Sequence, residues 1–297
     1  MTADNIVQYR SEWDGRIADF FVRLNKDDPT IRALTVEQWN NFAARGDADD
    51  FLVVEDSAQN IIGLLTTRRI TRQDIAIRHF CIYVILAERR RGLGSTLLEH
   101  VRSLDSNGEI SILECRVQST WLPGMRFLER HGFNPWLSWV GMERKRGTIQ
   151  VTPVENYRLR PATIEDSPSL SDINNAAHGS EISQSPEDFV KLLERDDNEA
   201  FVIEDCVSMR VIGFCVFEPD DGGSGWIDNL AIDPPYQRRG LGRWLVESAL
   251  ASIQGKSPRD VSLQCDATSS PALTLYGQLG FQEIDRSTLY QEKRNVC

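Results

Sequence analysis

The chain has 297 residues and a formal net charge of −11, and its 41% hydrophobic content supplies apolar material for two domains of about 150 residues. It has no run of about 18 apolar residues, and its first ten residues lack a positive-then-apolar signal pattern, so we expect no membrane span and no secretory signal. An acidic chain repels phosphates, which argues against a nucleic-acid partner.

The six cysteines indicate core packing rather than metal binding. They are Cys81, Cys115, Cys206, Cys215, Cys265 and Cys297. None forms a C-x-x-C pair and only four histidines are present, so we expect no metal site. Most of these cysteines lie in apolar, strand-like runs, which favours small core residues in a reducing cytoplasm.

The chain also repeats itself. Residues 51–56 resemble 201–205, Ile62-Gly63 matches Ile212-Gly213, Arg91-Gly92-Leu93-Gly94 matches Arg239-Gly240-Leu241-Gly242, Cys115 matches Cys265, and His131-Gly132-Phe133 matches Leu279-Gly280-Phe281. The offsets stay between 148 and 150, and the order is the same throughout. Two copies of one domain are therefore predicted, because this period is far too long for a solenoid.

The two copies differ in charge. Residues 1–150 contain 20 of the 33 basic and 20 of the 44 acidic residues, so residues 151–297 carry the whole of the −11. Charge, glycine and proline near 146–156 predict a linker there. We expect a first domain at 1–146, a linker at 147–156 and a second domain at 157–297.

The elements of the second copy follow from pattern, and the first copy gives the same order with weaker signals. We expect a strand at 157–160, helices at 163–177 and 186–194, strands at 200–204, 211–217 and 226–232, a helix at 241–253, a strand at 261–265, a helix at 271–279 and strands at 281–284 and 287–292. Thr163 and Ser185 are the expected helix N-caps, and residues 220–223 an expected turn. Strands interleaved with about four helices predict an α+β fold on a mixed sheet.

A glycine-containing loop, residues 237–242, joins a predicted strand to a predicted helix. The start of a helix leaves backbone N–H groups unpaired and carries partial positive charge, and glycine lets that backbone approach a phosphate. Arg238 and Arg239 add charge within the acidic half. The loop therefore suits a pyrophosphate, although a tight turn that binds nothing is the alternative for any single such loop.

The stretch from Leu230 to Gly242 resembles the acetyl-CoA-binding motif of the GNAT N-acetyltransferase superfamily, [QR]-x-x-G-x-[GA] after a strand. Residues 272–281 resemble the second motif of that family, A-x-x-[LF]-Y-x-x-x-G-F. The first copy supplies Arg89-Arg90-Arg91-Gly92-Leu93-Gly94 and residues 127–133 at the corresponding places. The chain is thus identified as a tandem GNAT protein, with two domains that each have a mixed, splayed sheet.

The resemblance implies acetyl-CoA as co-substrate in each domain. The implied binding residues are Leu230, Ala231, Ile232, Gln237, Arg238, Arg239, Gly240, Leu241 and Gly242 in the second copy, and Arg89, Arg90, Arg91, Gly92, Leu93 and Gly94 in the first. It also implies that the strand before the loop diverges from its neighbour, so that backbone groups hold the pantetheine arm.

Direct acetyl transfer requires a base for the amine and an acid for the leaving thiolate. Tyr276 stands where the family places its acid, and a phenol with a pKa near 10 stays protonated at neutral pH. A core tyrosine is the alternative. Leu128 holds the equivalent position in the first copy, and leucine donates no proton, which makes chemistry in the first domain doubtful.

The base is harder to assign. Some family members use a Glu on the strand before the second motif, where this chain has Gln264 in the second copy and Glu114 in the first. Asp228 is the preferred alternative, because it alternates with Ile227 and would then face the cleft. Glu218, at a strand end, comes third, and an ordinary solvated carboxylate is as good an interpretation of either.

Three functions remain open. The first is acetylation of a small cationic amine, to which the acidic second half would be attractive. The second is an activity like that of mycothiol synthase, another tandem GNAT enzyme. The third is a non-catalytic acyl-CoA sensor, which Leu128 and Gln264 favour. The partner is in each case a small molecule.

Overall fold

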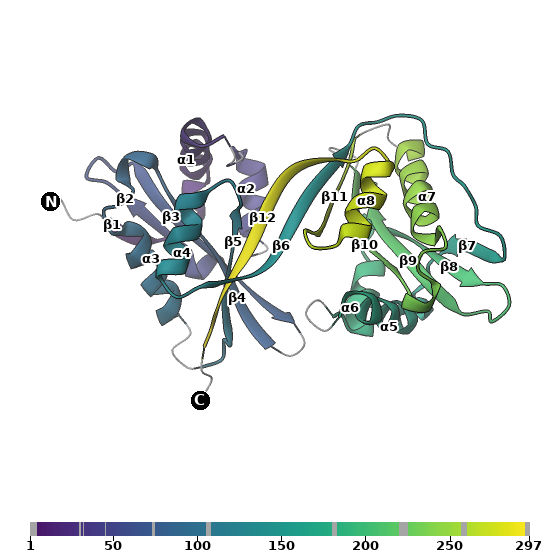
Figure 1. Ribbon diagram of the computed structural model, residues 1–297. Coiled ribbons are helices and arrows are strands. Elements are labelled where there is room, and N and C mark those ends of the chain that lie inside the picture. Colours follow the sequence, from purple (N-terminus) through teal and green to yellow (C-terminus); the bar gives the residue numbers. More distant parts are fainter. Residues whose placement is uncertain are drawn as a thin grey trace. The chain divides into compact units, whose positions relative to one another are not determined.

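The computed structural model describes residues 5–29, 31, 33–44, 46–72, 75–104, 108–179, 183–219, 225–256 and 260–294. The chain divides into two compact units (Figure 1). Unit 1 contains the residues up to 136 together with those from 288 onward, and unit 2 contains residues 137–287.

Unit 1 is a mixed sheet with helices. In chain order it contains β1 (Asn5–Gln8), α1 (Asp14–Asp27), α2 (Val36–Ala43), β2 (Leu52–Glu55), β3 (Ile61–Arg72), β4 (Ile75–Val84), α3 (Leu93–Ser103), β5 (Ile112–Gln118) and α4 (Leu122–Arg130). Its strand order is β1-β2-β3-β4-β5-β12, where β12 is Gln282–Lys293. Neighbours from β1 to β4 pair antiparallel, and β4 pairs in parallel with β5.

Unit 2 repeats this arrangement. It contains β7 (Tyr157–Pro161), α5 (Ser167–His178), α6 (Pro186–Leu193), β8 (Glu199–Asp205), β9 (Val211–Glu218), β10 (Gly225–Ile232), α7 (Leu241–Lys256), β11 (Val261–Asp266) and α8 (Ser270–Gln278). The strand order is β7-β8-β9-β10-β11-β6, where β6 is Asn134–Arg144. Here too a parallel pairing, that of β10 with β11, lies toward one end of the strand order. Two mixed α+β domains, each with four α-helices among the described residues, confirm the predicted fold class.

Each unit takes its outer strand from the other half of the chain. Residues 288–293 of β12 belong to unit 1, whereas residues 137–144 of β6 belong to unit 2. Strand β6 pairs antiparallel with β11 from Trp139↔Asp266 to Arg144↔Val261. The contiguous ranges expected from the sequence, 1–146 and 157–297, assign both of these segments to the opposite unit.

The predicted helices and strands of the second copy are close to the observed ones, and three details differ or escape comparison. The strands expected at 281–284 and 287–292 are one strand, β12, because Asp285 and Arg286 introduce no glycine or proline to break it. The first helix begins as a 3-10 turn at Ile164 before α5. The turn expected at residues 220–223 lies outside the described residues.

Both expected N-caps form capping boxes. Ser185 accepts a hydrogen bond from the backbone of Asp188, whose carboxylate accepts one from the Ser185 backbone N–H. Thr163 and Asp166 are arranged in the same way at the start of the 3-10 turn. These caps fix where the two helices on one face of the unit 2 sheet begin.

Apolar side chains from both faces of each sheet form separate clusters. In unit 2 one cluster joins α7 and α8 to the sheet and contains Tyr276, Leu245 and Val140 of β6. The other joins α5 and α6 to the opposite face through Leu170 and Phe189. Unit 1 has the same pair of clusters, and Tyr290 of β12 is buried in the one formed with α3 and α4.

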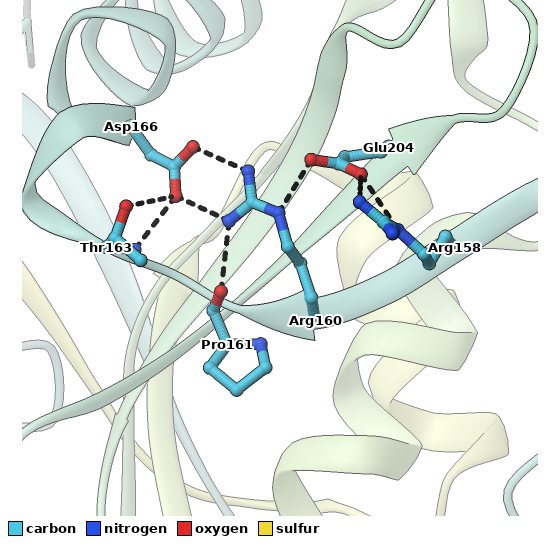
Figure 2. Close-up of polar contacts among 6 residues, drawn as sticks. All are labelled: Arg158, Arg160, Pro161, Thr163, Asp166 and Glu204. Atoms are coloured by element: carbon cyan, nitrogen blue, oxygen red, sulfur yellow. Dashed lines mark hydrogen bonds and ion pairs between the residues drawn. The ribbon is translucent and has the colours of Figure 1, made fainter.

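A charged network ties β7 to β8 and to the start of α5 (Figure 2). The Arg160 guanidinium donates to both oxygens of Asp166, at 2.7 and 2.8 Å, and at 2.6 Å to Glu204. Arg158 Nε donates to the other Glu204 oxygen at 3.0 Å. The carboxylates of Asp166 and Glu204 are nearly buried, so the arginines compensate charges that would otherwise be costly.

Candidate functional site

The two glycine loops have the same unusual backbone. In unit 2 the φ angles of Arg238 and Gly240 are +64° and +85°, and in unit 1 those of Arg90 and Gly92 are +63° and +94°. A non-glycine residue in the left-handed region costs about 1–2 kcal/mol. The same costly conformation at both arginines shows that the repeat extends to the loop backbone and its exposed N–H groups.

Each loop is closed by its first side chain. Gln237 Nε2 donates at 3.0 Å to the carbonyl oxygen of Ile232, the last residue of β10. In unit 1 Arg89 Nε donates at 2.9 Å to the carbonyl oxygen of Val84, the last residue of β4. Both bonds join a loop residue to the strand residue five positions earlier, so they hold the turn between strand and helix.

The arginines of each loop have different surroundings. Arg239 donates at 2.9 Å both to the Tyr157 hydroxyl and to the Pro235 carbonyl, and its guanidinium lies 5.0 Å from the Tyr236 ring centroid. In unit 1, Arg91 pairs with Glu88. By contrast, Arg238 and Arg90 are exposed, and the structure gives neither a hydrogen bond nor an ion pair with a described residue.

The second glycine of each loop lies against a helix. A Cβ atom on Gly242 would lie 3.5 Å from Leu275 of α8, and one on Gly94 would lie 3.3 Å from Phe127 of α4. A Cβ at Gly242 would therefore make an ordinary contact with α8, whereas one at Gly94 would require the Phe127 side chain to shift by a few tenths of an ångström. Leu241 and Leu93, which begin α7 and α3, are buried, so their contribution to a binding site is limited to their backbone.

The strand before each loop diverges from its parallel neighbour. The β10–β11 ladder contains three pairs among the described residues, from Gly225↔Val261 to Ile227↔Leu263. Leu230, Ala231 and Ile232 lie beyond the last pair and still pair with β9 on their other edge. In unit 1 the β4–β5 ladder likewise ends, at His79↔Glu114. This leaves polar backbone groups beside the path to the glycine loop.

Asp228 lies at an irregularity in β10. The register with β9 shifts between Ile227 and Asn229, so the simple alternation that would point Asp228 toward the cleft does not hold there. Its carboxylate is exposed and accepts a hydrogen bond from the Trp226 indole at 3.4 Å. A catalytic role for Asp228 therefore remains a prediction.

Tyr276 occupies the second turn of α8 and is almost completely buried. Its ring meets Phe281 edge-on, with the centroids 5.7 Å apart. Burial, with smaller effects of Cys215 and Cys265, raises the pKa of Tyr276 well above its ordinary value. The structure gives its hydroxyl no hydrogen-bond partner among the described residues, so a protonated phenol with an available proton lies in the α7–α8 cluster.

Two other sequence candidates are bound in ion pairs. Glu218 lies 2.9 Å from Arg195 at the end of β9. Glu114 is buried in unit 1 and contacts Arg72, His79 and Gln291 at 3.3, 3.4 and 2.8 Å. Burial alone would raise the pKa of Glu114, but hydrogen bonds from His79 and Gln291, with Arg72, lower it to about 2. A carboxylate held in this way is a weak base.

The sequence analysis did not identify His178, the last residue of α5. Its Nε2 lies 3.1 Å from the carbonyl oxygen of Leu230, on the diverging part of β10. The sequence offered two signals, because only four histidines are present and Gly179 marks the end of the helix.

A cluster of amide side chains lies near His178. Asn229 Nδ2 donates at 2.7 Å to Gln184 Oε1 and at 3.4 Å to Asn174 Oδ1. Asn174 and Asn175 come from α5, so strand β10 and helix α5 share these contacts. The cluster offers uncharged donors and acceptors on the α5 side of the strand.

The chain is similar to known acetyltransferases in both halves. Residues 167–281 match the model described as the acetyltransferase (GNAT) family, and residues 47–135 match the model described as the acetyltransferase (GNAT) domain. Each match falls within one compact unit. No helix among the described residues has the length and apolar character needed to cross a membrane.

Curated relatives match parts of the chain. A [ribosomal protein bS18]-alanine N-acetyltransferase of Escherichia coli is 40% identical over 55 residues, which is 18% of this chain and 37% of that protein. A mycothiol acetyltransferase of Catenulispora acidiphila is 26% identical over 226 residues, 71% of each chain. One from Actinosynnema mirum is 28% identical over 159 residues, 51% of this chain and 54% of that protein. The matched part of the chain thus spans about a third of the Escherichia coli protein, about half of the Actinosynnema protein and 71% of the Catenulispora protein.

Solved structures match the whole chain. A GCN5-related N-acetyltransferase from Sphaerobacter thermophilus has a TM-score of 0.84 at 16% identity, covering 98% of this chain and 95% of that one. A tandem GNAT protein from the clavulanic acid biosynthesis pathway has a TM-score of 0.72 at 15% identity and 98% coverage of both chains. At these identities the likeness shows the tandem fold alone.

Proposed function

Since the chain belongs to the GNAT acetyltransferase family and carries one of its domains in each compact unit, we propose that it transfers an acetyl group from acetyl-CoA to a primary amine. We propose unit 2 as the reacting unit. The observation that carries this is the buried, protonated phenol of Tyr276 beside a diverging strand pair, whereas unit 1 has the buried Leu128 at the matching position.

The loop after β10 supports binding of the pyrophosphate of acetyl-CoA. The first helical N–H to find a partner in α7 is that of Trp244, which donates to the Gly240 carbonyl, so earlier N–H groups remain for an anion. Arg238 adds an exposed cation without a described partner. Gln237 and Arg239 support the loop rather than supply its charge, and the polar edge of residues 230–232 suits an extended amide-containing arm.

The proposed chemistry is direct transfer. The amine nitrogen attacks the thioester carbonyl carbon, the C–N bond forms and the C–S bond breaks with its electron pair on sulfur. The Tyr276 hydroxyl then donates its proton to the sulfur, and the nitrogen proton released on attack restores the phenol. The raised pKa of Tyr276 keeps the hydroxyl protonated until the thiolate forms.

For unit 1 we propose binding of acyl-CoA without reaction. Its loop has the same backbone as the loop of unit 2, and its parallel strands diverge in the same way. Leu128 cannot protonate a thiolate, and Glu114 is held in ion pairs. Arg90 is the exposed cation at the position that matches Arg238.

A small cationic amine is the first substrate class we propose, because most of unit 2 comes from residues 151–297, which carry the net charge of −11. An uncharged, hydroxyl-rich amine such as an amino-sugar conjugate is the second. The uncharged cluster of Asn174, Gln184 and Asn229 favours it, as does the similarity to proteins named mycothiol acetyltransferase. A reducing, cytoplasmic setting suits the described cysteines, which are free thiols.

The test is thiol release from acetyl-CoA by the full chain with three amines: spermidine, glucosamine and an alanine-terminated peptide. Turnover of spermidine that weakens as salt rises would support the cationic class, because screening reduces electrostatic steering. Turnover of glucosamine without a salt effect would support the second class. Binding of acetyl-CoA with no turnover of any amine would replace the proposal with an acyl-CoA sensor.

A further inference from the structure

The imidazole of His178 has one nitrogen fixed and one available. Nε2 lies 3.1 Å from the Leu230 carbonyl oxygen, and a carbonyl oxygen only accepts hydrogen bonds, so Nε2 carries the proton. Nδ1 then holds the lone pair of a neutral ring. Desolvation lowers the pKa of His178 below its ordinary value, against smaller opposite effects of the Leu230 carbonyl and Asp266. The ring is therefore neutral at pH 7.

The ring lies where β10 and β11 diverge. Leu230 is three residues beyond Ile227, the last β10 residue paired with β11. Asp266, at the end of β11, is the charged side chain among the described residues that acts on the ring. Its carboxylate also accepts hydrogen bonds from Thr268, which keeps it on the β11 side. The imidazole thus interacts with both diverging strands.

His178 and Tyr276 approach the same strand residue from different layers. The Leu230 side chain packs against the α7–α8 cluster that contains Tyr276. Cys215, which lies opposite Leu230 in the β9–β10 register, is close enough to affect Tyr276 electrostatically. His178 reaches the Leu230 carbonyl from α5 on the other face. A proton acceptor and a proton donor therefore flank one point on β10.

The residues of unit 2 that the sequence suggested for the base are less suitable than His178. Glu218 is paired with Arg195, and residue 264 is a glutamine. Asp228 lies at the register shift, and no backbone hydrogen bond among the described residues orients its carboxylate. The imidazole differs from them because it is neutral and oriented by a backbone bond that leaves Nδ1 without a described partner.

We infer that His178 is the general base for acetyl transfer in unit 2, taking a proton at Nδ1 from the ammonium form of the substrate. This inference rests on the proposed function. His178 takes one proton, which leaves the amine lone pair free to attack the thioester, and it then passes that proton to solvent. Tyr276 supplies the proton that the departing sulfur needs, so the base and the acid are separate groups.

The matched test is His178→Gln in the full chain. Glutamine keeps an N–H that can donate to the Leu230 carbonyl but has no basic nitrogen. We expect kcat/KM for the best of the three amines to fall about 100-fold at pH 7, while the Kd of acetyl-CoA stays within about threefold. His100→Gln, which changes a histidine of α3 in unit 1, should leave the rate unchanged.

The pH profile provides the second measurement. In the wild type, kcat/KM should rise with pH through an apparent pKa below 6.5 and then level off, because the ring must be unprotonated to act. His178→Gln should lose this limb, and imidazole added to His178→Gly should restore part of the rate. A variant rate equal to that of the wild type, or a wild-type profile without the acidic limb, would overturn the inference. Wild-type protein that binds acetyl-CoA and turns over none of the amines would instead overturn the proposed function.

Discussion

Gln237 is bonded to Ile232: its side-chain amide donates at 3.0 Å to the carbonyl oxygen of that last strand residue. The side chain at the start of the glycine loop therefore holds the loop in place. Arg89 does the same at Val84 in unit 1. Gln237 and Arg89 thus hold the loops in place, whereas Arg238 and Arg90 are the exposed cations of the loops.

Replacing Arg238 with Gln should weaken acetyl-CoA binding. A charge-assisted hydrogen bond contributes about 1.5–3 kcal/mol, so the Kd should rise at least tenfold in calorimetry. Arg239→Gln is the control, because Arg239 is already bonded to Tyr157 and Pro235 and its loss should lower the Tm instead. A larger effect of Arg239→Gln on the Kd would contradict this assignment.

Tyr276→Phe should lower kcat by about 10²- to 10⁴-fold and leave the Kd of acetyl-CoA unchanged. The variant should fold, since its hydroxyl has no described hydrogen bond to lose. Tyr290→Phe is the control, because it removes a hydroxyl that donates to Glu129 in unit 1. It should lower the free energy of unfolding by about 1 kcal/mol and leave kcat unchanged. An unchanged kcat for Tyr276→Phe would remove Tyr276 from the mechanism.

Arg160→Met should destabilise unit 2 by up to about 3 kcal/mol, because it leaves the carboxylates of Asp166 and Glu204 with less compensation. Arg195→Met removes surface pairs with Asp197 and Glu218 and should cost less than Arg160→Met, about 1 kcal/mol. Urea unfolding followed by circular dichroism measures both. Equal losses for the two variants would show that burial of the network contributes nothing.

The same network predicts a loss of stability in acid. Burial raises the pKa of Asp166, but Arg160 and Thr163 outweigh it and hold this pKa below the ordinary value. Arg160 and Arg158 likewise lower the pKa of Glu204. The contribution is therefore full above the ordinary carboxylate pKa and declines as pH falls below it. Arg160→Met should reduce this slope between pH 5 and pH 3, and an unchanged slope would count against the network.

His79 predicts the opposite trend in unit 1. Burial would lower the pKa of His79, but Cys81 and Glu114 raise it from 6.5 to about 9. The stabilisation is therefore full below pH 6.5 and is lost as pH rises through about 9. His79→Gln should therefore reduce the change in Tm with pH between pH 6.5 and about 9. Glu114→Gln should reduce the same pH dependence of Tm. A double variant whose effect differs from the sum of the two single effects would measure the interaction energy between His79 and Glu114.

Much of the fold could be predicted because local chemistry agreed with the final structure. Ser185 followed by Pro186 marks a helix start by capping alone, and the β-branched and aromatic residues of 211–217 identify that segment as a strand before its partner strands are known. The offset of 148–150 identified the duplication, which no single element could show. The glycine loops could likewise be placed, since a turn between strand and helix is encoded within six residues.

Other features depend on contacts between residues far apart in the chain. The lack of a glycine or proline near Asp285 permits one continuous strand, but nothing there indicates that residues 288–293 complete the unit formed by the start of the chain. His178 ends its helix 52 residues before Leu230, and only the packing of α5 on the sheet brings them together. The irregularity at Asp228 is a property of paired strands, so alternation in one strand could not show it.

The placing of residues 288–293 in unit 1 has a consequence for biosynthesis. When the ribosome has made the first 136 residues, the sheet they form still has β5 at its edge, without its outer neighbour. Tyr290, which is buried among the side chains around α3 and α4, is made more than 150 residues later. The unit that is translated first is therefore completed last, and an open strand edge must be kept from aggregating until nearly 300 residues have been joined.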